Sequence, residues 1–165
     1  MDILELDRGI TLAWCPLEEE TGHNAGLRLL AALYRRETGM DLPPISRTER
    51  AKPYFPNSPF HFSISHTPRH AFCALSPSPI GIDAEETDRR IRPELAGKIL
   101  SPGERRQYEA APDKRRALLT FWVLKEAAVK LSGEGLRSYP NHTDFLLTDP
   151  RVRELGGCYV AILEE

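Results

Sequence analysis

The segment Ile80-Gly81-Ile82-Asp83-Ala84-Glu85, residues 80–85, combines a clear strand pattern with two closely spaced carboxylates. The alternation of Ile80 and Ile82 with other residues predicts a short strand whose isoleucines share one side. Asp83 and Glu85, two residues apart, then project from one face of that strand. Carboxylates so close repel each other, and a hard cation such as Mg²⁺ would offset the repulsion. A solvated strand face is the alternative, because charged residues are mostly exposed.

The chain before this strand shows strand, helix and extended patterns in turn. Residues 10–14 alternate in hydropathy and predict an opening strand or hairpin. Helical spacing of apolar residues then begins after Asn24, a good N-cap, and ends at Gly39. Residues 41–59 contain five prolines, too many for a helix interior, so we expect this segment to run extended.

The remaining segments complete the first half and predict a second half with a similar outline. Residues 60–64 and 70–75 are expected to form a hairpin around Thr67-Pro68-Arg69. After residues 80–85, we expect helices over 92–99, 103–110 and 114–132 and strands over 144–148 and 157–163. Both halves therefore follow roughly strand, helical region, strand, strand. We expect an α+β fold of two related halves, residues 1–79 and 80–165, with a cleft at the seam.

Composition narrows the class of protein. The 165 residues carry a formal charge of −2, which argues against a general nucleic-acid binder. Cys15, Cys73 and Cys158 are widely spaced and form no C-x-x-C pattern, so they indicate neither a disulfide framework nor a zinc site. The first residues lack a signal-peptide pattern, and no uncharged stretch approaches the ~20 residues that span a bilayer. We expect a cytoplasmic protein that does not bind a membrane.

A second group of polar residues lies within the helix expected over residues 114–132. Trp122, Glu126 and Lys130 are spaced i, i+4, i+8 and therefore share one helix face. This face could place a carboxylate and an ammonium in a site. The alternative is a common surface ion pair between Glu126 and Lys130, worth only ~0.3–0.5 kcal/mol, beside a tryptophan of the core.

A third group lies where the strand over residues 60–64 ends. Ser63-Ile64-Ser65-His66-Thr67 supplies hydroxyls and an imidazole at a turn, and Arg69 follows. Such donors can bind a phosphate. A lone histidine at a turn is otherwise an ordinary surface residue. No P-loop and no G-x-G-x-x-G motif is present.

These three groups, in this order and spacing, resemble the signature blocks of the 4′-phosphopantetheinyl transferase superfamily. The G-[IV]-D-x-E block corresponds to residues 81–85, and the W-x-x-K-E-x-x-x-K block corresponds to residues 122–130. A third block begins at Lys52-Pro53 and ends at Phe62-Ser63-Ile64-Ser65-His66. The resemblance covers roughly residues 50–148 well and the first fifty residues loosely.

The resemblance implies a fold and an activity. The third block is typical of the duplicated, surfactin-synthetase-activating type, in which two pseudo-twofold-related α/β halves hold the active site at their seam. This chain resembles a member shortened near residues 18–24, and we expect it to be a monomer. The implied reaction moves phosphopantetheine from coenzyme A, the co-substrate, to a serine of an apo acyl or peptidyl carrier protein and releases 3′,5′-ADP.

Roles for individual residues also follow from the resemblance. It implies that Asp83, Glu85 and Glu126 bind Mg²⁺, with Mn²⁺ as the alternative. Glu126 would accept the serine proton, directly or through water. Lys130 would neutralise the pyrophosphate and favour departure of 3′,5′-ADP.

The remaining predicted contacts are to coenzyme A. By resemblance, Ser65 and His66 would hold its 3′-phosphate, and Lys52 would lie beside the adenine. Lys125 would orient the site or pair with a phosphate. Two other functions stay open: a non-catalytic module that binds coenzyme A or a carrier protein, and metal-dependent phosphoester hydrolysis, which needs only the carboxylates.

Overall fold

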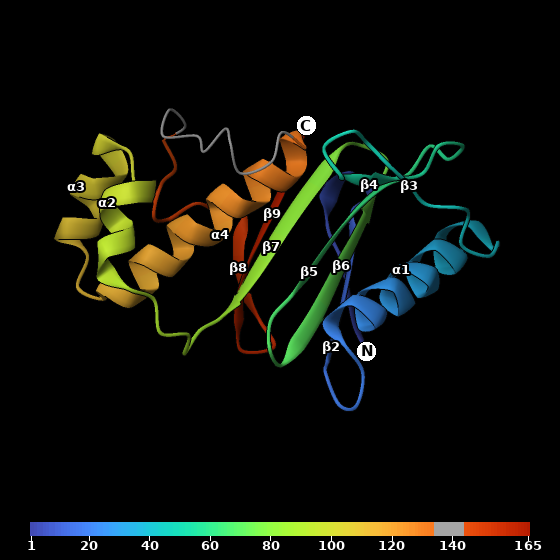
Figure 1. The fold of residues 1–165 in the computed structure, drawn as a ribbon, viewed down its shortest axis with the longest axis horizontal. Helices are drawn as coiled ribbons and strands as arrows, with labels where there is room; N and C mark the ends of the chain where they lie inside the picture. The colour runs from blue at the N-terminus through green and yellow to red at the C-terminus, as the bar shows by residue number, and fades with distance from the viewer. Residues whose placement is uncertain (134–143) are drawn as a thin grey trace.

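The computed structural model describes residues 1–133 and 144–165 and shows a mixed α+β fold (Figure 1). Its first sheet contains four strands, in the spatial order β1, β2, β6, β5. Its second sheet contains three strands, in the order β7, β9, β8. All pairings are antiparallel. The strands are β1 (Asp2–Glu5), β2 (Thr11–Pro16), β5 (His61–His66), β6 (His70–Ser76), β7 (Ile80–Glu86), β8 (Val152–Leu155) and β9 (Cys158–Glu164).

Helices cover the outer faces of the two sheets. Helix α1 (Gly22–Thr38) packs on the first sheet, and α4 (Lys114–Ser132) packs on β7 and β9 of the second. The short helices α2 (Ala96–Ile99) and α3 (Pro102–Ala110) lie at the far side of α4 in Figure 1. Two 3₁₀ turns, η1 (Asp7–Gly9) and η2 (Pro93–Leu95), and a two-residue strand pair complete the elements. That pair joins β3 (Ser46–Arg47) to β4 (Pro53–Tyr54).

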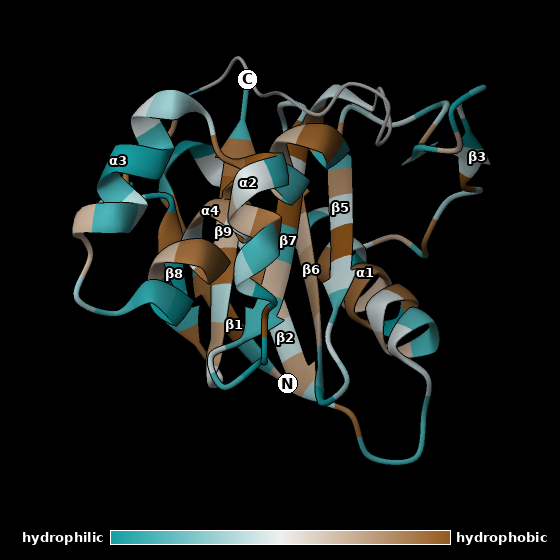
Figure 2. Cartoon of the chain, turned by 60° about the vertical axis from the view of Figure 1, so that its left-hand side comes forward, coloured by the Kyte–Doolittle hydropathy of each residue, from teal (hydrophilic) through white to brown (hydrophobic). Residues whose placement is uncertain are grey.

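Three apolar clusters hold these layers together. One joins α1 to the first sheet around Leu29, Leu33 and Phe62, and another joins α4 to the second sheet around Phe121 and Leu124. The third lies between the two sheets and contains Leu12, Phe72, Ala74, Ile80, Ile82, Ala84, Val160 and Ile162. In Figure 2 the central strands are mostly brown, whereas α3 is mostly teal. The order of layers is therefore helix, sheet, sheet, helix.

The two sheets and the helices that cover them are connected in the same order. In the first sheet a strand (β2), a helix (α1) and a hairpin (β5, β6) follow one another, and the last strand pairs with the first. In the second sheet β7, α4, β8 and β9 repeat this order, again with the last strand beside the first. This is the arrangement expected of a duplicated unit; the division between residues 79 and 80 stays a prediction.

Two predicted boundaries need correction. Helix α1 begins at Gly22, and its N-cap is Thr21, whose hydroxyl accepts a hydrogen bond from the Asn24 amide at 3.2 Å. Asn24 therefore lies in the first turn of the helix and is not its N-cap. The N-cap is three residues earlier, at Thr21, whose backbone is extended. Residues 92–99 divide into the turn η2 and the single-turn helix α2. The end at Gly39 is as predicted, with φ 71°.

The strand predicted over residues 144–148 is wrong. This segment gives its backbone hydrogen bonds to side chains of α3 instead of to a strand. Phe145 N–H donates to Glu104 at 3.0 Å, and Leu147 N–H donates to Gln107 at 2.9 Å. Phe145, one of the apolar residues that suggest a strand, is buried, but it packs in the cluster that contains residues of α4. The last hairpin is formed by β8 and β9 instead, joined by Gly156 and Gly157, both with positive φ.

Gly81 determines how closely α4 approaches β7. A Cβ atom at this position would overlap the Ala127 carbonyl oxygen and the Leu131 backbone nitrogen. Backbone atoms of a packed helix cannot move aside as a flexible side chain can. Gly81 therefore permits the contact that brings the polar face of α4 over Asp83 and Glu85.

We expect Gly81→Ala to destabilise the protein by about 1–3 kcal/mol, the usual cost of inserting volume into a packed core. Urea unfolding followed by circular dichroism measures the change. Gly97→Ala is the matched control, because the nearest atom to a Cβ there is an Arg105 nitrogen at 3.7 Å. Equal stability of the two variants would contradict this account of the helix contact.

Within the described ranges, no helix is both long enough and apolar enough to cross a membrane.

Candidate active site

The acidic face of β7 lies against one face of α4. Glu85 accepts a hydrogen bond from Trp122 Nε1 at 3.2 Å, and Asp83 Oδ1 lies 2.8 Å from Lys130 Nζ. Glu126 is one helical turn from each of these α4 residues, so it shares their face and lies between the two contacts. Helix and strand run in opposite directions here. The structure thus brings Asp83 and Glu85 of β7 beside Glu126 and Lys130 of α4, although Asp83 and Glu126 are 43 positions apart along the chain.

Positively charged side chains neutralise both β7 carboxylates. Asp83 is 7% exposed and pairs with Lys130. Glu85 pairs with Arg89, whose guanidinium also lies 5.6 Å from the centre of the Trp122 ring. Each carboxylate thus has a positively charged side chain beside it, and these charges offset the repulsion between the two carboxylates. The sequence does not predict this pair, because Glu85 lies on a strand and Arg89 follows it after a turn, so helical i, i+4 spacing does not apply.

Strand β5 lies beside β7, and two serine hydroxyls connect them. Ser63 Oγ accepts from the Ile82 amide at 3.0 Å, and Ser65 Oγ accepts from the Ala84 amide at 3.1 Å. Ser65 also donates to Asp83 Oδ1 at 3.0 Å. These hydroxyls satisfy edge amides of β7 that have no strand partner on this side. Ser65, 5% exposed, is therefore placed to orient Asp83, and its predicted contact with a phosphate stays a prediction.

A cavity of about 670 Å³ opens at the Glu85 end of the site. His66, Arg69, Glu85 and Arg89 are among its lining residues. His66 is exposed and lies against Gly22, the first residue of α1, where a Cβ atom would approach the imidazole within 2.5 Å. His66 thus sits at the cavity wall, and its predicted contact with a phosphate stays a prediction.

A second cavity, of about 230 Å³, lies at the Lys130 end. Lys52, Phe62, Ile64 and Lys130 help to line it, and Lys130 Nζ lies 3.4 Å from the Ile64 carbonyl oxygen. The Lys52 ammonium donates to the carbonyl of Leu131, near the C-terminus of α4. Burial lowers the pKa of Lys52. The two cavities thus flank Asp83 along the contact of β5, β7 and α4.

Lys125 does not join this group. It is 1% exposed, and its ammonium lies 2.9 Å from Glu104, which is also fully buried. Glu104 is held further by the amides of Ser101 and Phe145. The pair holds α3 on α4. The orienting role predicted for Lys125 stays a prediction, and a phosphate contact would require the pair to open. Ser101-Pro102-Gly103-Glu104 was a recognisable capping-box signal for Glu104.

The donor set at β7 and α4 suits Mg²⁺ by its chemistry. Three carboxylates from Asp83, Glu85 and Glu126 supply the oxygen ligands that a hard cation takes. Within the part of the chain that the structure describes, however, the set whose ligand atoms all lie within 4.8 Å of one another is a different one, His70, Glu86 and Cys158. The carboxylates are instead held by Lys130 and Arg89. A metal ion would therefore exchange for these ammonium and guanidinium partners.

Comparison with known proteins gives consistent matches to one family. Residues 79–159 match the model of the "4'-phosphopantetheinyl transferase superfamily". The "4'-phosphopantetheinyl transferase Sfp" of Bacillus subtilis (strain 168) is 36% identical over 114 residues, which is 66% of this chain and 50% of that protein. A "4'-phosphopantetheinyl transferase" of Bacillus subtilis is 37% identical over 94 residues, 53% of this chain and 40% of the relative.

The chain belongs to the 4′-phosphopantetheinyl transferase superfamily. The family resemblance seen in the motifs is thereby confirmed. A further relative, "4'-phosphopantetheinyl transferase gsp" of Aneurinibacillus migulanus, is 30% identical over 92 residues. The chain spans about half, or less, of the length of these curated relatives, from 38% to 50%. The family match includes the whole of β7 and α4, which carry Asp83, Glu85, Glu126 and Lys130.

Proposed function

We propose that this chain transfers 4′-phosphopantetheine from coenzyme A to a serine hydroxyl of an apo carrier protein. One observation carries the proposal: the acidic face of β7 meets the Trp122, Glu126 and Lys130 face of α4 between two cavities. Phosphoryl transfer needs charge neutralisation, positioning and a base, and these residues offer all three. Because β5, β7 and α4 come from a single chain, the site needs no second copy, and we expect a monomer.

Asp83, Glu85 and Glu126 are the residues that would hold Mg²⁺ or Mn²⁺. The ion, when bound, would supply positive charge for the oxygens of a diphosphate. Ser65 would keep Asp83 in place through the 3.0 Å hydrogen bond. Trp122 would do the same for Glu85 through its indole N–H.

The proposed reaction is a displacement at one phosphorus atom. The carrier serine oxygen forms a bond to the phosphorus that bears pantetheine. The bond from that phosphorus to the bridging oxygen breaks, and this oxygen departs on 3′,5′-ADP. The serine proton passes to Glu126, directly or through water. Lys130, whose ammonium lies 2.8 Å from Asp83 Oδ1, would offset the negative charge that develops on the departing oxygen.

The two cavities offer places for the rest of coenzyme A. His66 is exposed at the wall of the larger one and is our candidate for the 3′-phosphate. Lys52, in the smaller one, is our candidate for a contact near the adenine. Docking of an acidic carrier would use basic side chains near the site; Arg105, Arg106 and Arg115 are exposed on α3 and α4.

The test uses the purified chain, Mg²⁺, coenzyme A and a panel of apo carrier proteins from fatty-acid, polyketide and peptide synthesis. Intact-mass spectrometry should show a gain of one phosphopantetheine on at least one carrier, and a chelator should abolish the gain. Binding of coenzyme A without a mass gain on any carrier would instead favour a binding module. Loss of a phosphate ester from coenzyme A without a carrier would favour hydrolysis.

Ser65→Ala separates two roles for this serine. If Ser65 positions Asp83, the variant should lower kcat about 10-fold or more at a nearly unchanged KM for coenzyme A, because one charge-assisted hydrogen bond is lost. If Ser65 instead binds the 3′-phosphate, the KM for coenzyme A should rise. Steady-state transfer assays with varied coenzyme A distinguish these outcomes.

Ser63→Ala is the matched control for Ser65→Ala. Both serines are buried and both hydroxyls accept from a β7 amide, but the Ser65 hydroxyl also donates to Asp83. Both variants should therefore lose about 1–3 kcal/mol of stability, the cost of an unsatisfied buried amide. An equal loss of kcat in both would show that the effect comes from the strand contact and not from Asp83.

A further inference from the structure

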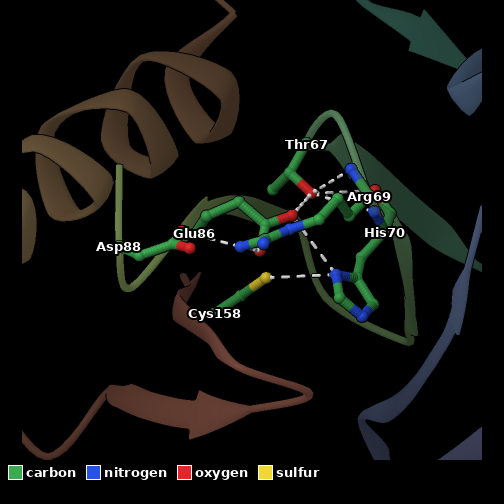
Figure 3. Close-up of polar contacts among 6 residues, drawn as sticks. All are labelled: Thr67, Arg69, His70, Glu86, Asp88 and Cys158. Carbon is green, nitrogen blue, oxygen red and sulfur yellow. Dashed lines mark hydrogen bonds and ion pairs between the residues drawn. The ribbon is translucent and has the colours of Figure 1, made fainter. Parts of the chain in front are cut away.

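A second cluster of metal-binding side chains lies next to the proposed site, on the other side of the β7 end. His70 begins β6, Glu86 ends β7 and Cys158 begins β9 (Figure 3). The three ligand atoms lie within 4.8 Å of one another. Glu86 and Cys158 are paired residues of the β7–β9 ladder, so the sheet register itself fixes two of the three. Residues 88 positions apart in sequence are thus gathered at one point.

Two of the three donor separations in this cluster match those at a tetrahedral zinc ion. His70 Nδ1 lies 3.3 Å from Glu86 Oε1 and 3.7 Å from Cys158 Sγ. Zn–N and Zn–O bonds of ~2.0–2.1 Å and a Zn–S bond of ~2.3 Å place such donors about 3.4 Å and about 3.6 Å apart at a tetrahedral centre. The donor types also match, since zinc accepts imidazole nitrogen, thiolate sulfur and carboxylate oxygen together, whereas Mg²⁺ takes oxygen ligands.

The surroundings supply the other parts of a metal site. Thr67 Oγ1 donates to Glu86 Oε1, the oxygen that faces His70, at 2.5 Å, and Arg69 donates to Glu86 Oε2 at 2.8 Å. Both carboxylate oxygens are therefore held in place. Arg69 also pairs with Asp88 at 2.6 Å. The two carboxylates of Glu86 and Asp88 share the one positive charge of Arg69, so a net negative charge remains in this group. The large cavity is lined by Thr67, Arg69 and Glu86 and offers a path of entry and room for a water ligand.

We propose that His70, Glu86 and Cys158 form a zinc site that links the first sheet to the second. Zinc binding would release the Cys158 thiol proton to solvent and leave the thiolate on the metal. The fourth position would be taken by water from the cavity. The site is separate from the Asp83, Glu85 and Glu126 carboxylates and joins β6 to β7 and β9. The wide spacing of the three cysteines led us to expect no zinc site, because a set with one cysteine leaves no spacing pattern in the sequence.

Co²⁺, a spectroscopic substitute for zinc, tests the proposal in the full chain. One equivalent of Co²⁺ should produce a thiolate-to-cobalt charge-transfer band and the intense visible bands of tetrahedral coordination. Zn²⁺ should displace it and raise the Tm. Co²⁺ bound at the carboxylates would give no thiolate band, so the readout does not depend on transferase activity.

Cys158→Ser should abolish the thiolate band, and His70→Gln should weaken Co²⁺ binding by at least about 10-fold. Cys73→Ser is the matched control, because Cys73 is equally buried but lies in the core between α1 and the first sheet. It should keep the band. Absence of the band in the unmodified protein, or its persistence in a folded Cys158→Ser variant, would overturn the proposal. Since the unmodified protein is itself decisive, the conclusion does not depend on how the variants fold.

Discussion

Glu126→Gln should lower phosphopantetheine transfer by about 10²- to 10⁴-fold, the range typical of losing a general base. Glutamine keeps the size of the side chain but cannot accept the serine proton, and it is a poorer ligand for a hard cation. Glu126 is partly exposed on α4, so the fold should be retained. Rates of carrier modification at saturating coenzyme A measure the effect, and circular dichroism checks the fold.

Glu109→Gln is the control for this variant. Glu109 is an exposed glutamate of α3, outside both cavities and away from β7. Its substitution should leave the transfer rate unchanged. Undiminished transfer by Glu126→Gln would refute the role proposed for this carboxylate. It would also refute the hypothesis that this face of α4 is catalytic.

The second large effect concerns stability. Glu104→Gln should destabilise the protein by about 3–5 kcal/mol, because it leaves the buried Lys125 ammonium without its carboxylate. Glu104 also accepts from the Ser101 and Phe145 amides, so α3 and residues 144–147 should loosen together. Urea unfolding monitored by circular dichroism gives the free energy of unfolding.

A double variant tests the cause. Glu104→Gln combined with Lys125→Met removes both charges and should recover a large part of the loss, because a buried pair replaced as a unit costs far less than one broken. Arg35→Ala, which breaks an exposed ion pair with Asp41, should change stability little. Additive losses in the double variant would show that the Lys125–Glu104 contact is not what holds α3.

Much of this fold follows from local patterns in the sequence. The hairpin of β5 and β6, the strand β7 and the helix α4 each carry a strong periodic signal and end where a turn or glycine predicts. Phe145 shows where such reasoning fails. Its neighbours are apolar like those of a strand, but the partners of its backbone are Glu104 and Gln107, some 40 residues away. Only the tertiary packing of α3 decides between the two.

The candidate site was predictable in its residue types but not in its contacts. Spacing and family resemblance together predict Asp83, Glu85 and Glu126 as site residues, and their role as metal ligands stays a prediction. The hydrogen bond from Ser65 to Asp83 could not be predicted, because β5 and β7 meet through serine side chains and not through a strand ladder. The burial of Lys125 was likewise hidden, since a lysine beside Glu126 in sequence points a hundred degrees away around the helix.

Release of 3′,5′-ADP, measured with and without an apo carrier protein, tests the proposed function most directly. The proposal predicts one molecule of 3′,5′-ADP for each phosphopantetheine gained by the carrier, and none when the carrier is omitted. Release without a carrier would indicate a hydrolase. No release with any carrier, although coenzyme A binds, would contradict the transfer that we assign to Asp83, Glu85, Glu126 and Lys130.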